Sequence, residues 1–404
     1  MSCQPCSNKN SDHPSSNNNR VHPHNSGTKF INDNRLPVVS RFEGYSIIKS
    51  KTSVSTNIFN GGQLDFVISP SIQSFVNKIV CHIRVTNTGV GAINFDPAFI
   101  WDRIQYLSSS GSVMYEVNSD AIYLHKVNYN RNYLEKVGFS EGLNTTTYNY
   151  GVSLGAGVSA DYYIHMTPCP LTENSGILPC ALKGDLTIRM YFQSICTDTI
   201  ADLSVNDVEL ILDGEKYNST TLALEKSKRM SENLKYRIIT PVIASQKTLA
   251  LAASTSYDFE LTSSMGKSSK LVIFLRSGAR AYSNNTVFYG NTQIDSVELY
   301  DQNSQRIANS VSPALNRMLF KSHLEGDLYD IKDAIQYIPF HIAQSEEQII
   351  EGAYVGSYDL SGNERIRLNL GSTFAPGSYT VYIYSYQYET FEINNGVWDI
   401  KKGY

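Results

Sequence analysis

The stretch LTIRMYF at residues 186–192 alternates between apolar and polar side chains. Leu186, Ile188 and Met190 share one side of an extended chain, because successive side chains of a β-strand point to opposite faces. Thr187 and Arg189 face the other way. An antiparallel sheet with one face on a core and the other in solvent shows this pattern. We therefore predict a sandwich strand at residues 186–192.

The same alternation recurs in both halves of the chain, at residues 64–68, 257–261 and 366–370. Tyr (27) outnumbers Phe (16), and such a composition favours pleated, half-buried surfaces over helices. Helix formers gather at 221–236 (TLALEKSKRMSENLKY), and a second short helix at 310–320 is interrupted by proline. We expect an all-β protein with short helices in its connections.

The two halves repeat one order of elements. Residues 101–113 and 294–307 both read as strand, polar turn and strand, and the aligned Asp102 and Asp295 are 193 residues apart. An apolar-Pro segment precedes a loop and a strand in each half, with Pro168 and Pro339 171 residues apart. This period is far too long for a solenoid and fits two sandwiches of about eight strands. Chance similarity between generic strand pairs is the alternative.

Charge and hydropathy exclude several classes of protein. The net charge is −4, and no long Lys/Arg run exists, so direct, sequence-specific binding of nucleic acid is not the expected role. The first residues do not read as a signal peptide, and no apolar run reaches the length of a membrane span. Six cysteines are too few for a disulfide scaffold, so folding in a reducing cytosol or nucleus is expected.

Two glycine motifs resemble enzyme signatures. Residues 151–155 (GVSLG) match the nucleophile elbow of hydrolases, which needs a strand-to-helix turn with Ser153 at its apex. Residues 155–160 half-resemble a dinucleotide loop, which needs a βαβ unit. Both lie in an all-β context, so structural loops are expected. The acidic pair Glu346 and Glu347 has no identifiable partner carboxylate.

Cysteine and histidine offer one candidate metal site. Cys3 and Cys6, with His13, His22 and His24, could hold zinc, but the irregular spacing in a polar segment favours a mobile tail. The other histidines are isolated: His82, His125, His165, His323 and His341. We expect no catalytic, cofactor-binding or metal-binding residue, no cofactor, and no enzyme.

A basic cluster lies in the expected connector. Lys226, Lys228 and Arg229 are most simply read as a solvated face of the helix. A contact to an inner membrane or to a minor coat protein is the alternative.

Four stretches, in order along the chain, carry a resemblance to a known family. They are 162–188, with its Pro168, Leu178-Pro-x-x-Ala-Leu182 and following strand; 208–239 through the connector; 338–362; and the tyrosine-rich 382–398. Together they resemble the double jelly-roll major capsid proteins of tailless phages, adenoviruses, polinton-like viruses, virophages and nucleocytoplasmic large DNA viruses. The chain is shorter than most giant-virus members.

Composition predicts the polar arm and the helical connector, and with them the resemblance implies a division into four parts. These are a flexible polar N-terminal arm at 1–38, a first eight-stranded jelly roll at 39–220, a helical connector at 221–236 and a second eight-stranded jelly roll at 237–404. It also implies a homotrimer that forms a pseudo-hexameric capsomer and tiles an icosahedral DNA-virus shell. Neighbouring capsomers, penton and minor capsid proteins, and an inner membrane are the expected partners. The virion is the expected location, with assembly in the host cytoplasm or nucleus.

A different class of function stays open. A two-domain carbohydrate- or receptor-binding β-sandwich, such as a fibre or lectin, would use tyrosine-rich loops to stack on sugars; Tyr148, Tyr150, Tyr282 and Tyr289 are the candidates. A capsid subunit should hold its two barrels side by side. A lectin should have independent domains and an exposed aromatic cleft.

Overall fold

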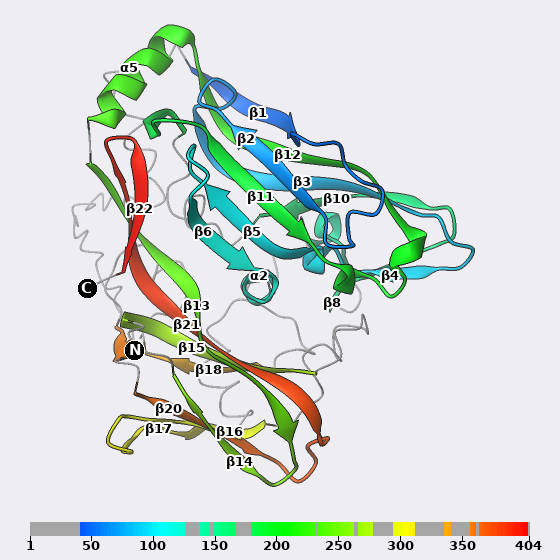
Figure 1. The fold of residues 1–404 in the computed structure, drawn as a ribbon, viewed down its shortest axis with the longest axis vertical. Helices are drawn as coiled ribbons and strands as arrows, with labels where there is room; N and C mark the ends of the chain where they lie inside the picture. Colours follow the sequence, from blue (N-terminus) through cyan, green and yellow to red (C-terminus); the bar gives the residue numbers. More distant parts are fainter. Residues whose placement is uncertain are drawn as a thin grey trace, which may run out of the picture.

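Two β-sandwiches lie one above the other in the computed structural model, joined by long strands that run between them (Figure 1). The structure describes residues 41–126, 137–144, 149–166, 179–231, 233–261, 266–277, 294–311, 335–340, 356–360 and 363–402.

The first barrel consists of two four-stranded antiparallel sheets. One has the order β1 (Arg41–Lys49), β12 (Leu203–Tyr217), β3 (Phe75–Asn87) and β10 (Ser159–His165). The other has the order β2 (Gln63–Ile68), β11 (Leu186–Phe192), β5 (Trp101–Leu107) and β6 (Val113–Asn118).

The second barrel repeats this plan. Its first sheet has the order β13 (Asn233–Leu251), β21 (Gly377–Asn394), β15 (Gly266–Ser277) and β18 (Ile335–Pro339), with β19 (Tyr358–Leu360) on β15 and β22 (Val397–Lys402) on β21. Its second sheet has the order β14 (Ser256–Glu260), β20 (Arg365–Leu370), β16 (Ile294–Tyr300) and β17 (Arg306–Val311).

The strand orders of the two barrels correspond one to one. Strands β1, β12, β3 and β10 take the places of β13, β21, β15 and β18, and β2, β11, β5 and β6 take those of β14, β20, β16 and β17. The predicted pair of eight-stranded antiparallel jelly rolls is therefore confirmed. Asp102 and Asp295 lie on the equivalent strands β5 and β16, as the sequence repeat predicts.

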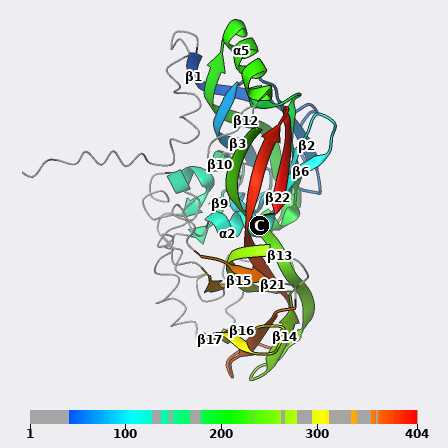
Figure 2. The same cartoon turned by 90° about the vertical axis from the view of Figure 1, so that its left-hand side faces the viewer.

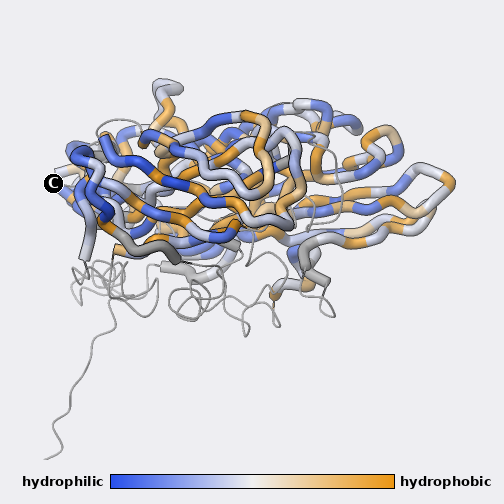
Figure 3. Tube along the Cα trace, turned by 90° about the horizontal axis from the view of Figure 1, so that it is seen from below, coloured by the Kyte–Doolittle hydropathy of each residue, from blue (hydrophilic) through white to orange (hydrophobic). Residues whose placement is uncertain are grey.

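The predicted strands coincide with observed ones, and their alternation has the expected cause. Strand β11 spans the whole of residues 186–192, and its residues alternate between buried and half-buried positions. Strands β2, β14 and β20 cover 64–68, 257–261 and 366–370 to within one residue at either end. Apolar and polar colours alternate along many strands in Figure 3. Each sandwich closes on the apolar side of its strands.

Helices occur in the connections. Helix α2 (Ser119–Lys126) follows β6, and helix α5 (Ser219–Met230) joins the barrels at one end of the molecule (Figure 1). The side chain of Asn218 accepts a hydrogen bond of 2.8 Å from the Thr221 N–H and so caps α5. In the described part of the chain no helix is both long and apolar enough to cross a membrane.

The observed helix differs from the predicted connector at 221–236. It begins at Ser219 and ends at Met230, and residues from Asn233 onward already belong to β13. Leu234 is buried and pairs with Ile393, so the end of the predicted helix is held in the sheet by a partner distant in sequence. Of the predicted helix at 310–320, Ser310 lies in strand β17 and 312–320 fall outside the described residues.

Candidate inter-barrel interface

Strand β21 is buried on both of its faces. Val381 and Ile383 belong to the core of the second barrel. Tyr382, Tyr384 and Tyr386, which point to the opposite side, pack into the hydrophobic cluster that contains the first barrel's core. One strand therefore contributes to two cores. Antiparallel sheets more commonly pack one face on a core and leave the other in solvent.

The neighbouring strands divide in the same way. On β15, Leu271 and Ile273 face the second barrel's core, whereas Val272 and Phe274 face the first barrel. The Phe274 ring stacks on the Tyr382 ring, with 5.1 Å between centroids. We call the side chains that this sheet turns toward the first barrel the inter-barrel face. Its members are Val272, Phe274, Ile335, Tyr337, Tyr382, Tyr384 and Tyr386.

A buried ion pair crosses the interface. Arg276 on β15 donates a hydrogen bond to the carboxylate of Asp120 in helix α2, and the two side chains are only 4% and 5% exposed. The Arg276 guanidinium also lies 4.9 Å from the centroid of the Tyr382 ring. A charge this deeply buried is tolerated when it has a partner of opposite sign, so the pair selects one docking position for the barrels.

A second polar contact lies beside the ion pair. The Tyr384 hydroxyl donates a hydrogen bond of 2.9 Å to Oδ1 of Asn118 at the end of β6. The same oxygen accepts the Ala121 N–H at 3.0 Å, at the start of helix α2. Burial, and secondarily the nearby Asp120, raises the pKa of Tyr384, so the phenol stays neutral and available as a donor.

A hairpin extends the contact along the first barrel. Strand β22 folds back on β21 and lies beside β6, as the side view shows (Figure 2). At its turn the Gly396 carbonyl accepts a hydrogen bond of 2.8 Å from the Lys183 N–H of the first barrel. Gly396 has φ +75°, and a Cβ there would lie 2.8 Å from the Lys183 nitrogen. The Phe391 and Trp398 rings of the hairpin meet edge to face at 5.0 Å.

The basic cluster of helix α5 is only partly the solvated face that the sequence suggested, because Arg229 departs from it. Arg229 is buried and makes an ion pair of 3.1 Å with Glu225, four residues earlier. Thr221, Glu225 and Arg229 lie one turn apart and form the buried side of the helix, whereas Leu224 is exposed. The interpretation was wrong for Arg229 because pairing with Glu225 allows a charged stripe to be buried. Lys228 lies on the exposed side.

The motif at residues 151–155, which matches the nucleophile elbow, lies in a β-sheet. Ser153 lies in β9 (Val152–Leu154), which pairs with β4 (Ile93–Phe95), and the next element is strand β10. A nucleophile elbow requires a helix at that point. Glu346 and Glu347 lie outside the described residues.

Most candidate metal ligands also lie outside the described residues, including Cys3, Cys6, His13, His22 and His24. Within the described ranges, no three His, Cys, Asp or Glu side chains come together as a metal site. His82 makes contacts of 2.9 Å with Asp161 and 3.5 Å with Glu209 on neighbouring strands. Cys81 and Cys196 are both buried.

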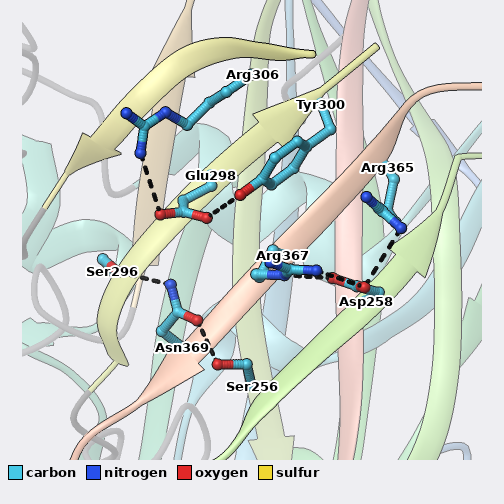
Figure 4. Close-up of polar contacts among 9 residues, drawn as sticks. All are labelled: Ser256, Asp258, Ser296, Glu298, Tyr300, Arg306, Arg365, Arg367 and Asn369. Atoms are coloured by element: carbon cyan, nitrogen blue, oxygen red, sulfur yellow. Dashed lines mark hydrogen bonds and ion pairs between the residues drawn. The ribbon is translucent and has the colours of Figure 1, made fainter. Parts of the chain in front are cut away.

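Figure 4 shows a polar network on the outer face of the sheet β14-β20-β16-β17. Arg367 donates two hydrogen bonds, of 2.8 and 3.0 Å, to the carboxylate of Asp258. The first barrel has the same arrangement at the equivalent position, where Arg189 donates bonds of 2.8 and 2.9 Å to Asp65. These hydrogen bonds lower the pKa of both carboxyl groups.

The sequence contains a signal for this repeated pair. The motif LDF at 64–66 matches YDF at 257–259, and IRM at 188–190 matches IRL at 366–368. Aligning these short strands would have identified the Asp-Arg pair in both barrels. The pair is a cross-strand contact on an outer face, which stabilises the sheet.

The fold has known counterparts, although no family model and no curated protein matches the sequence. A chain of the PBCV-1 virus capsid aligns with TM-score 0.63 and 12% identity, over 92% of this chain and 100% of that one. A chain of the Sputnik virophage aligns with TM-score 0.60 and 11% identity, over 100% of this chain and 94% of that one.

The Faustovirus major capsid protein aligns with TM-score 0.58 and 8% identity, over 92% of each chain. These identities are low, so the similarity concerns the architecture, and it extends over both barrels and their connection. The chain therefore folds as a double jelly roll, the architecture that it shares with the PBCV-1 virus capsid chain and the Faustovirus major capsid protein.

Proposed function

We propose that this chain is the major capsid subunit of an icosahedral DNA virus. The observation that carries the proposal is the inter-barrel face: two jelly rolls of identical strand order are fused through a sheet that is buried on both sides. Such a fusion makes one rigid block from two equivalent units. Solved structures with the same double architecture include a chain of the PBCV-1 virus capsid and the Faustovirus major capsid protein.

Three copies would form a homotrimer with six barrels, which is a pseudo-hexameric capsomer. Capsomers of this kind would tile the shell of the virion, with penton proteins, minor capsid proteins and an inner membrane as further partners. Contacts between different surfaces of identical subunits can close into rings and still leave other surfaces free for tiling. Assembly would take place in the host cytoplasm or nucleus.

The role is structural rather than enzymatic, and the net charge favours contact with protein over contact with nucleic acid. The net charge of −4 disfavours a coat that binds the phosphate backbone through its whole surface. A lectin or fibre, the alternative, would expose aromatic side chains on independent domains. The two barrels instead share a buried interface that contains Tyr382, Tyr384 and Tyr386, so they are not independent domains, and this favours the capsid role. The loop tyrosines Tyr148, Tyr282 and Tyr289 lie outside the described residues, and the side chain of Tyr150 is not described.

The test is the assembly state of the full chain. Sedimentation should give a particle of three times the chain mass of 45.1 kDa, and negative-stain images should show a six-lobed outline with threefold symmetry. A monodisperse monomer at micromolar concentration, or specific binding on a glycan array by a monomer, would contradict the proposal.

A further inference from the structure

The first barrel has an open counterpart of the inter-barrel face. Its sheet β1-β12-β3-β10 is equivalent to the sheet β13-β21-β15-β18, whose outer side the first barrel covers. On the outer side of the first barrel's sheet, Tyr45, Ile47 and Tyr163 are 69%, 52% and 44% exposed. Equivalent sheets of one chain therefore differ in one respect: one is covered by a barrel, and the other turns apolar side chains to solvent.

These side chains form ordered rows across the sheet. Ile47 on β1 pairs with Ile211 on β12, which pairs with Val80 on β3, so three aliphatic side chains lie next to one another. Ile211 and Val80 are half-buried. We call Tyr45, Ile47, Val80, Ile211 and Tyr163 the open face. Together with the exposed Tyr45 and Tyr163, this apolar row is a candidate surface for protein contact.

The neighbouring row is polar, and its charges are already paired. Lys49 lies 3.1 Å from Glu209, and Glu209 lies 3.5 Å from His82. The His82 ring stacks on Tyr163, with 4.7 Å between the centroids. Because these groups have partners within the sheet, another protein can cover them at a smaller desolvation cost than isolated charges would impose.

The contact inside the chain joins two different surfaces. The second barrel contributes the outer side of a sheet, and the first barrel contributes the end of β6 and helix α2, through Asn118 and Asp120. In a contact of this heterologous type, each barrel uses one of the two surfaces and leaves the other without a partner. The first barrel therefore retains an uncovered sheet, and the second barrel retains an uncovered edge. The unused sheet is the open face. The unused edge is β17, the equivalent of β6, where Ile307 is exposed.

We infer that the open face is the docking site for the second barrel of a neighbouring copy of this chain, whose β16–β17 edge takes the place that β5–β6 takes within the chain. This inference rests on the proposed function and assigns its trimer contact to particular residues. The open face is more polar than the inter-barrel face, as expected for a surface that is exposed before subunits associate.

The test uses the full-length chain and three variants. An open-face variant carries Tyr45→Ser and Ile47→Glu, and an edge variant carries Ile307→Glu. The matched control is Leu224→Glu on helix α5, which replaces an equally accessible apolar side chain elsewhere on the surface. Wild type and control should sediment as trimers. Each of the other two variants should weaken the trimer at least tenfold, while its circular dichroism spectrum matches that of wild type and shows that the chain is still folded.

Mixing the two defective variants tests whether the contact is heterologous. The open-face variant keeps an intact edge, and the edge variant keeps an intact open face, so an equimolar mixture should form a 1:1 dimer joined by one good contact. A contact of the open face with itself would leave the mixture without such a dimer, and that result would overturn the inference.

Hydroxyl-radical footprinting of the wild type gives a readout that does not depend on variants. Tyr45 and Phe139 are 69% and 76% exposed in the single chain. In the trimer Tyr45 should be oxidised several-fold more slowly than Phe139. Equal oxidation would show that the open face stays in solvent, and protection that disappears on deletion of residues 1–38 would identify the N-terminal arm as the occupant; either overturns the inference.

The outcomes separate this inference from the proposed function. A wild-type trimer that tolerates the open-face and edge substitutions contradicts the assignment of the contact and leaves the capsid role standing. A wild-type monomer contradicts both.

Discussion

Arg276 of the second barrel and Asp120 of the first form an ion pair that is almost fully removed from solvent, although 156 residues separate them in the chain. The surrounding contacts are apolar and aromatic and could tolerate small shifts between the barrels. A buried charge pair tolerates them poorly, because a misaligned charge loses its partner in a medium of low polarity. The pair therefore contributes more to the choice of docking position than to overall stability.

The first prediction concerns this pair. Arg276→Met leaves the Asp120 carboxylate buried without its partner, so it should lower the free energy of unfolding by about 3–5 kcal/mol. Combining it with Asp120→Leu should recover most of that loss, because no uncompensated charge remains. Chemical denaturation measures both effects. As a control, Arg367→Met in the more exposed pair with Asp258 should cost no more than about 1 kcal/mol. Equal losses for the two single variants would contradict this account.

The second prediction concerns the hydroxyl of Tyr384. Tyr384→Phe keeps the ring and removes the donor to Asn118, so it should cost about 1 kcal/mol in unfolding free energy. Tyr382→Phe is the control, because among the described residues the Tyr382 hydroxyl accepts only a long hydrogen bond of 3.5 Å, from the Gln246 amide. The two variants should therefore differ in thermal denaturation. If Tyr382→Phe proves the more damaging, the hydrogen bond to Asn118 is not the important contact.

The third prediction is a loss of stability in acid. Hydrogen bonds from Arg189 and Arg367 hold the pKa of Asp65 and Asp258 below the ordinary value. A carboxyl group with a lowered pKa in the folded state stabilises the protein above the pKa of the unfolded chain, near pH 4, and loses this contribution as the pH falls through the folded pKa. Tm should therefore fall between about pH 4 and pH 2. With Asp65→Asn and Asp258→Asn together, Tm should be lower at neutral pH and should fall less in acid; an unchanged acid slope would show that other groups dominate.

The fourth prediction concerns Gly396 at the β21–β22 turn. Gly396→Ala must adopt a positive φ and also brings a methyl group within 2.8 Å of the Lys183 nitrogen. Gly111→Ala is a matched control, with φ +82° and no neighbouring atom within 4 Å. The control should cost only the conformational strain of about 1–2 kcal/mol. Gly396→Ala should cost more, and the difference measured by denaturation reports the contact between the hairpin and the first barrel. Equal costs would mean that this contact can relax freely.

Local alternation predicted the strands well where one face is apolar and the other polar. Strand β11 was located to the residue because its two faces differ along the whole stretch. The repeated order of strands also predicted the duplicated sandwich. The predicted end of the connector helix was less accurate. Its last residues are good helix formers locally, and pairing with β21 holds them in β13. Arg229 was misjudged because the sequence pattern does not reveal which side of a helix is covered.

The sequence by itself determined the class and number of the barrels, because alternation and turn residues are local signals that specify strands and their order. The tertiary structure alone decided how the barrels dock. Along β21, tyrosines alternate with aliphatic residues, and both kinds of side chain can be buried. The alternation therefore does not indicate that the tyrosines pack against the other barrel. Asp120 and Arg276 likewise look like ordinary surface charges, and only the packing of distant segments removes both from water and makes each the partner of the other.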